Sequence, residues 1–175
     1  MIRAESPTIS AKSIIGNTYA MCAIKTDDTV RCWGDAGKGG TTPAISAKSI
    51  AATSMAMCAI KPDDTVYCWG DLGNGGTTPS PTISAKSLVG AYGAMCAIKL
   101  DDTVQCWGIS GDGGTTPSPV ISAKSITAAS NGAMCAIKTD DTVQCWGAGG
   151  YGNVAPSPTI SAKSIASMGG RSEER

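Results

Sequence analysis

The 175-residue sequence contains no histidine and no phenylalanine. Histidine is the side chain that most often serves as a general base or a zinc ligand, so its absence argues against chemistry that depends on an imidazole. The carboxylates recur mainly as Asp-Asp pairs, and no nucleophile stands beside a base with a reason for a shifted pKa. We therefore expect no enzyme activity, no metal site and no cofactor.

An excess of charge and a long apolar run are absent as well. The chain has 14 basic and 14 acidic residues, and its lysines alternate with aspartates instead of clustering. Nucleic-acid binding usually requires a basic patch, so we expect no nucleic-acid partner. No apolar run approaches the roughly 20 residues that cross a bilayer, so we expect no membrane span.

Cysteine, in contrast, is abundant and regularly placed. Eight cysteines form four pairs with the same spacing, which is typical of proteins folded in an oxidising compartment. The first residues, "MIRAESPTIS", lack the apolar stretch of a secretion signal. We expect a secreted or cell-surface protein whose signal peptide is not present in this numbering.

The chain consists of repeats. The string "SAKSI" or "SAKSL" begins at Ser10, Ser46, Ser84, Ser122 and Ser161, at steps of 36, 38, 38 and 39 residues. A period of about 38 is typical of helical pairs or of β-propeller blades. We expect one repeat domain over residues 1–170, with units at about 10–45, 46–83, 84–121 and 122–160, followed by a charged tail over 169–175.

Strands fit these units better than helices. Each unit is interrupted by Gly-Gly and by Thr-Pro or Ser-Pro, and its apolar stretches are short. In the first unit we expect strands at about Ala11–Ile15, Ala20–Ile24 and Val30–Trp33, with a hairpin tip over Lys25–Thr29.

A three-residue tip would place the two cysteines of each unit directly opposite each other, within disulfide range. This register predicts four bridges within the units: Cys22–Cys32, Cys58–Cys68, Cys96–Cys106 and Cys135–Cys145. Eight cysteines allow on the order of a hundred pairings, and bridges between neighbouring units remain an alternative. Zinc is the weaker alternative, because nine residues separate the cysteines of a pair.

One tryptophan follows the second cysteine of each unit, and a glycine follows the tryptophan. Such a row can fill the gaps between neighbouring sheets, or it can form an exposed ligand platform. We favour the core role for Trp33, Trp69, Trp107 and Trp146.

The repeated string "CAIK-x-DDTV-x-CWG" resembles the blade motif of the regulator of chromosome condensation (RCC1-like) repeat family, whose bacterial blades read approximately "CAL…DGTVYCWG". The resemblance covers about 150 residues and implies an all-β, β-propeller-like protein of four blades, each a small antiparallel sheet. Propellers host unrelated activities, so the resemblance carries no particular function. The family's Asp-Gly tip is Asp-Asp here, so the second Asp must adopt a left-handed backbone that glycine accepts more freely.

The chain has four hairpins but five copies of the strand that begins a unit. "SPTISAKSI" occurs at Ser6–Ile14 and again at Ser157–Ile165, and we interpret 157–166 as a surplus strand. A surplus strand, including Ile160 and Ile165, can pair with another molecule, head to tail, into a filament or a closed multimer. Our first functional hypothesis is therefore a non-enzymatic extracellular structural protein whose partner is itself.

The alternative is a propeller that binds a protein or a glycan, such as an adhesin or an enzyme inhibitor. Two loops of each unit vary while the rest of the unit is nearly copied, and loops of this kind usually carry contacts. The larger side chains in these loops are Tyr19, Met55, Leu72, Tyr92, Ile109 and Tyr151.

Overall fold

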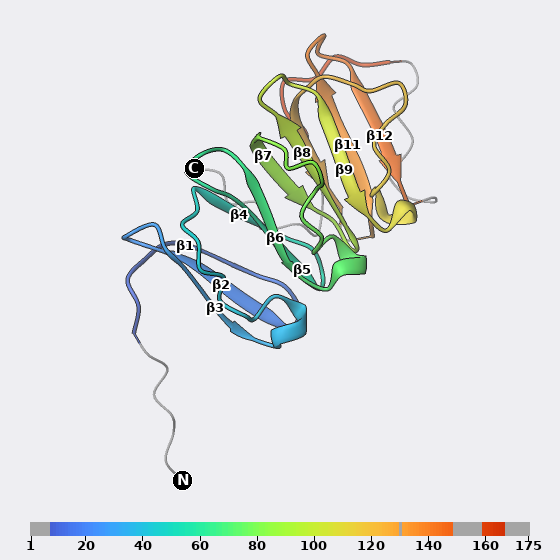
Figure 1. The fold of residues 1–175 in the computed structure, drawn as a ribbon. Helices are drawn as coiled ribbons and strands as arrows, with labels where there is room; N and C mark the ends of the chain where they lie inside the picture. Colours follow the sequence, from blue (N-terminus) through green and yellow to red (C-terminus); the bar gives the residue numbers. More distant parts are fainter. Residues whose placement is uncertain (1–7, 130, 149–158, 167–175) are drawn as a thin grey trace.

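The computed structural model describes residues 8–129, 131–148 and 159–166, and it contains four three-stranded antiparallel sheets (Figure 1). Each sheet is one blade, in the strand order first-second-third, which confirms the predicted all-β fold. The strands are β1 (Ala11–Gly16), β2 (Ala20–Lys25) and β3 (Val30–Gly34) in blade 1; β4 (Ser49–Ala52), β5 (Ala56–Ile60) and β6 (Val66–Gly70) in blade 2; β7 (Ala85–Gly90), β8 (Ala94–Lys99) and β9 (Val104–Gly108) in blade 3; and β10 (Ala123–Ala128), β11 (Ala133–Lys138) and β12 (Val143–Gly147) in blade 4.

The hairpin between the second and third strands has the predicted three-residue tip. In blade 1 the Lys25 amide donates to the Thr29 carbonyl at 2.9 Å, and Ile24 pairs with Val30. The second Asp of the tip, Asp28, has a φ of 69°, so it takes the left-handed conformation that the sequence required. The corresponding aspartates of the other tips have φ values of 68° to 70°.

This register sets the cysteines opposite each other, and all four predicted bridges are confirmed. Each bridge joins adjacent strands within one blade across ten residues of sequence. A loop of this length stabilises a fold by about 2–3 kcal/mol in the chain-entropy model. The bridges strengthen single blades and leave the joining of blades to other contacts.

The blades pack face to face, and every blade has two different faces. One face, which we call the disulfide face, carries the two cysteines with an alanine, an isoleucine and a valine, as in Ala94, Cys96, Ile98, Val104 and Cys106 of blade 3. The other, which we call the Met-Trp face, carries Leu88, Met95, Ala97 and Trp107 in blade 3. In each of the three hydrophobic cores, the disulfide face of one blade meets the Met-Trp face of the next.

The segment between two blades contributes to both of them. Ser46 forms a β-bridge with Thr29 at the outer edge of blade 1, and the chain then enters β4 of blade 2. The same bridge recurs as Thr65–Ser84, Thr103–Ser122 and Thr142–Ser161. The fifth copy of the repeat therefore contributes Ser161 to the outer edge of blade 4 in its own chain. The role of 157–166 as a surplus strand stays a prediction.

The four blades form an arc in which the first strands, β1, β4, β7 and β10, lie next to one another. The successive blades stand side by side from β1–β3 to β10–β12 (Figure 1). Within the described residues, no hydrophobic core joins blade 4 to blade 1, so the arc leaves one end face open on each. The charged tail predicted over 169–175 lies outside the described residues.

The open end makes the fourth bridge the most accessible one. Cys22, Cys58 and Cys96 are fully buried under the next blade, whereas Cys135 and Cys145 are half-buried. Thiol attack requires access to a sulfur atom, so mild reduction without denaturant should break Cys135–Cys145 before the other three bridges. Timed alkylation followed by peptide mass spectrometry measures this order. Simultaneous loss of all four bridges, or earlier loss of another, would contradict it.

Candidate protein-binding face

Each blade has two ends, and the varied loops lie together at one of them. In blade 1, Ala20 pairs with Gly34, which places the loop before β2 beside the segment after β3. That segment forms a single 3-10 turn, η1 (Ala36–Lys38), with counterparts η2 (Leu72–Asn74) and η3 (Ser110–Asp112). The three turns lie at the same end of their blades (Figure 1). We call this end the loop rim and the opposite one, with the hairpin tips, the tip rim.

Short polar side chains fix the loop rim. The Asn17 carboxamide oxygen accepts from the amides of Tyr19 and Ala20, each at 2.8 Å, and its nitrogen donates to the Lys38 carbonyl. The Asp35 carboxylate accepts from the Gly37 amide at 2.9 Å and so caps η1. These hydrogen bonds hold the loop backbone of blade 1 in one conformation, so little of its conformational entropy would be lost on binding.

Contacts between blades tie the rim together. The Lys38 ammonium of blade 1 pairs with the Asp71 carboxylate of blade 2 at 3.0 Å, and it also lies 3.4 Å from the Met55 sulfur. Hydrogen bonds from Asn74 and Lys38 lower the pKa of Asp71 to about 2. The Ser54 amide and hydroxyl both donate to the Tyr92 carbonyl of blade 3. The sequence did not predict these contacts, although the charges of Lys38 and Asp71 in otherwise glycine-rich turns were a visible signal of the first.

The loop rim gathers exposed apolar side chains of the varied loops. The structure exposes Tyr19 on blade 1, Leu72 on blade 2, and Tyr92 and Ile109 on blade 3, whereas Met55 is half-buried beside Lys38. Tyr151 lies outside the described residues. The structure thus brings the varied positions of three blades to one side of the molecule, and their role in binding remains a prediction.

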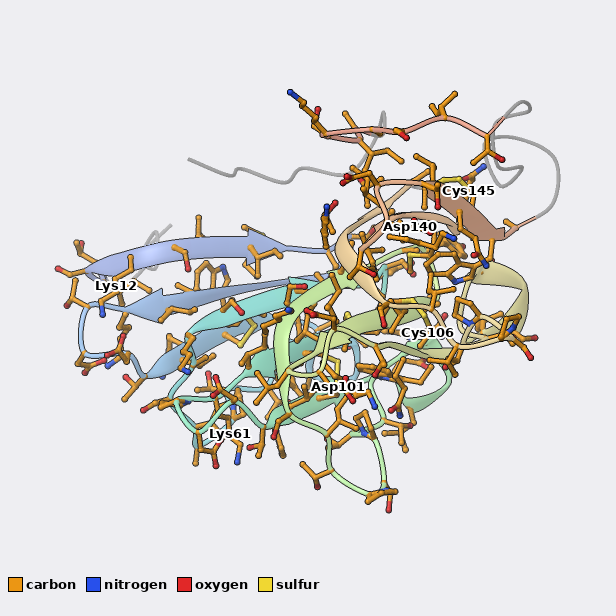
Figure 2. All side chains as sticks on the ribbon, turned by 90° about the horizontal axis from the view of Figure 1, so that it is seen from above. Lys12, Lys61, Asp101, Cys106, Asp140 and Cys145 are labelled. Carbon is orange, nitrogen blue, oxygen red and sulfur yellow. A yellow bond between two sulfur atoms is a disulfide. The ribbon has the colours of Figure 1, made fainter. Side chains whose placement is uncertain are left out.

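The tip rim differs, because it is nearly identical in every blade and is charged. The Asp27 carboxylate accepts from the Thr29 amide and hydroxyl and pairs with Lys25, while Asp28 pairs with Lys12. In Figure 2, one labelled charged residue of each blade marks this rim: Lys12, Lys61, Asp101 and Asp140. The tip carboxylates form ion pairs with lysines and accept hydrogen bonds from threonines. The part of the chain that the structure describes holds no cluster of three metal-ligating side chains.

The tryptophans lie where blades meet, with one exception. The indole nitrogens of Trp69, Trp107 and Trp146 each donate to a glycine carbonyl of the preceding blade, at 3.0 to 3.3 Å. Trp33 does not occupy the core position that we predicted for it. It is 42% exposed, against 9% for Trp69, because no described blade precedes blade 1. Of the other predicted positions, Ile160 is exposed and Ile165 is half-buried.

Comparisons with known proteins support the architecture. The CRINKLY WD40 ectodomain of the receptor kinase ACR4 from Arabidopsis thaliana matches with 22% identity and a TM-score of 0.68, over 94% of this chain and 59% of that one. The entire ectodomain of the receptor kinase CR4 from Physcomitrella patens matches with 22% identity and a TM-score of 0.66, over 82% and 42%. No family model and no curated protein sequence matches the chain.

A third similar structure is Prp20p, the yeast RCC1, from Saccharomyces cerevisiae, a protein described with its binding to Gsp1p and histones. It matches with 12% identity and a TM-score of 0.61, over 82% of this chain and 47% of that one. The chain therefore has an RCC1-like β-propeller repeat fold. It spans between 42% and 59% of the length of these three structures. No described part of it forms a helix long and apolar enough to span a membrane.

The tip aspartates predict a loss of stability in acid. Hydrogen bonds from Thr29 lower the pKa of Asp27 from 3.8 to about 2, and the equivalent threonines lower the pKa values of Asp63, Asp101 and Asp140. The folded-state pKa is depressed, so the stabilisation is complete above the unfolded pKa and disappears as the pH falls through the folded pKa. The melting temperature should therefore drop between about pH 4 and pH 2.

The matched control replaces the first Asp of all four tips with asparagine. This variant should melt at a lower temperature at neutral pH and should show a shallower decline in acid, because the carboxylate with the lowered pKa is gone from each tip. Parallel declines of the two proteins, followed by circular dichroism, would contradict the assignment.

Proposed function

We propose that this chain is a non-enzymatic, extracellular protein-binding module whose contact surface is the loop rim. The observation that carries the proposal is the difference between its two rims, one of which is the same in every blade while the other varies. The tip rim repeats the same ion pairs in every blade, whereas the loop rim differs from blade to blade and exposes Tyr19, Leu72, Tyr92 and Ile109. Aromatic and aliphatic side chains on a rigid scaffold are the usual anchors of protein interfaces.

Three further features support this proposal. The inter-blade ties of Lys38 and Ser54 hold the rim in place before a partner arrives, which limits the entropy lost on binding. Four disulfides suit an oxidising, extracellular setting. Two of the similar structures are receptor ectodomains. Apolar anchors favour a protein partner over a glycan.

Self-association is a second candidate function, in which the chain is a structural protein that forms a filament or a closed multimer. The predicted surplus strand over 157–166 gives it little support, because Ser161 is engaged with Thr142 in its own chain. A separate observation favours it: blade 1 and blade 4 each present an end face that no described blade covers.

The loop-rim proposal predicts that binding depends on Leu72 and Tyr92. The unchanged protein and a Leu72→Ser/Tyr92→Ser variant are each immobilised and exposed to the proteins secreted by the cells that produce this protein. The variant should fail to bind a partner that the unchanged protein retains. The control is Leu100→Ser/Val120→Ser, which changes two apolar residues outside the loop rim. Their exposed fractions, 54% for Leu100 and 62% for Val120, are similar to the 70% of Leu72 and the 52% of Tyr92. Equal retention by all three proteins, or no retained protein, would refute the proposal.

A further inference from the structure

The three interfaces between blades are built from the same contacts. On the Met-Trp side, each uses one aliphatic residue of the first strand, then methionine and alanine of the second strand and tryptophan of the third. These sets are Ile50, Met57, Ala59 and Trp69 in blade 2; Leu88, Met95, Ala97 and Trp107 in blade 3; and Ile126, Met134, Ala136 and Trp146 in blade 4. The three methionines are completely buried by this packing.

Blade 1 carries the same set on a face that no described blade covers. Its members are Ile14, Met21, Ala23 and Trp33, which occupy equivalent positions in the strand registers. Ile14 is 61% exposed, and Met21 is half-buried where its equivalents are fully buried, whereas Ala23 is already buried in the single chain. Within residues 8–129, 131–148 and 159–166, no group accepts a hydrogen bond from the Trp33 indole, whereas the other three indoles are bonded to glycine carbonyls.

Blade 4 presents the matching half of such an interface. Its disulfide face carries Ala133, Ile137, Val143 and the Cys135–Cys145 bridge, as in the other blades. The three apolar side chains are already buried in the single chain, whereas both cysteines are half-buried. One position differs: Thr127 pairs in register with Cys135 at the place held by Ile15, Ala51 and Val89 in the other blades. The end face of blade 4 therefore has the residue types of the other disulfide faces, is more polar at one position, and is accessible mainly at its two cysteines.

We propose that the Met-Trp face of blade 1 docks on the disulfide face of blade 4 of a second copy of this chain. The occupant follows from the molecule itself, because the same two faces already meet three times within one chain. The contact is heterologous, so each copy uses one face of each kind, and repeated docking gives a ring or a filament according to the rotation. This inference rests on self-association, the second candidate function, and is independent of binding at the loop rim.

Residues 163–166 enter the design of this test. The residues after Ser46 continue as the first strand of blade 2, and 163–166 are the corresponding residues after Ser161. A docked copy supplies its own β1 as the next first strand, so 163–166 would compete with it. A chain that ends at Lys163 keeps the Ser161–Thr142 bridge and removes this competition, so it should associate at least as strongly as the full chain.

Complementation between single-face variants tests the proposal. Ile14→Glu places a charge on the Met-Trp face and Thr127→Glu places one on the disulfide face, and each alone should weaken self-association by about tenfold or more. In an equimolar mixture, the intact disulfide face of the first variant meets the intact Met-Trp face of the second. Sedimentation analysis should then show particles of two chains, which neither variant forms alone. Val120→Glu, with Val120 62% exposed against 61% for Ile14, is the control that should associate like the unchanged protein.

Two further variants guard against misfolding and an alternative contact. Trp33→Ala should weaken association without introducing a charge, and Thr127→Val should strengthen it by restoring an apolar contact of the kind that Val89 makes in blade 3. Multimers that persist in every face variant, or that vanish in the chain ending at Lys163, would overturn this interface while leaving self-association standing. An unchanged protein that sediments as a single chain at all concentrations would overturn both.

Discussion

The packing of a Met-Trp face against a disulfide face is the contact on which the rest of the structure depends. A three-stranded sheet of 14 to 17 residues has two faces and no interior of its own, so an isolated blade leaves its apolar side chains in water. The disulfide staples each hairpin but adds only its two sulfur atoms to the core. Each interface buries one aliphatic residue, one methionine, one alanine and one tryptophan against the isoleucine and valine of the facing blade. This burial supplies the hydrophobic term, at about 1.5–3 kcal/mol for each large side chain.

This dependence explains why some positions are copied and others vary. Met57 and Trp69 must fit a cavity whose walls come from another blade, and any change in one blade would need a matching change in its neighbour. The Trp69 indole adds a directional constraint, because it bonds to the Gly39 carbonyl of blade 1. The loop rim carries no such constraint at Leu72 or Tyr92, whose side chains face solvent. Variation therefore collects there, and it can serve recognition without weakening the core.

Local features of this fold could be predicted from the sequence, and relations between blades could not. The Cys22–Cys32 register and the left-handed Asp28 follow from the length of one hairpin, which lies within a single stretch of sequence. The exposure of Trp33 depends on whether another blade precedes it, and identical motifs conceal that difference. The role of Ser161 could not be predicted either. Sequence comparison identifies the repeated segment as the start of a unit, and it does not show that the same segment also pairs with the preceding blade. The loop-rim residues were identifiable as variable, but the ties of Lys38 and Ser54 between blades required coordinates.

The two surfaces are compatible because they occupy different parts of the blade. Each internal interface keeps the loop rims of successive blades on the same side of the arc, as the positions of η1, η2 and η3 show (Figure 1). A docked copy that repeats this interface would extend the same side with its own Tyr19, Leu72, Tyr92 and Ile109. Association would then present many copies of the loop rim to one partner surface, and weak single contacts would combine into strong attachment through effective concentration. In such an assembly, contacts between end faces determine how many loop rims are joined together, and the loop-rim residues determine which partner is bound.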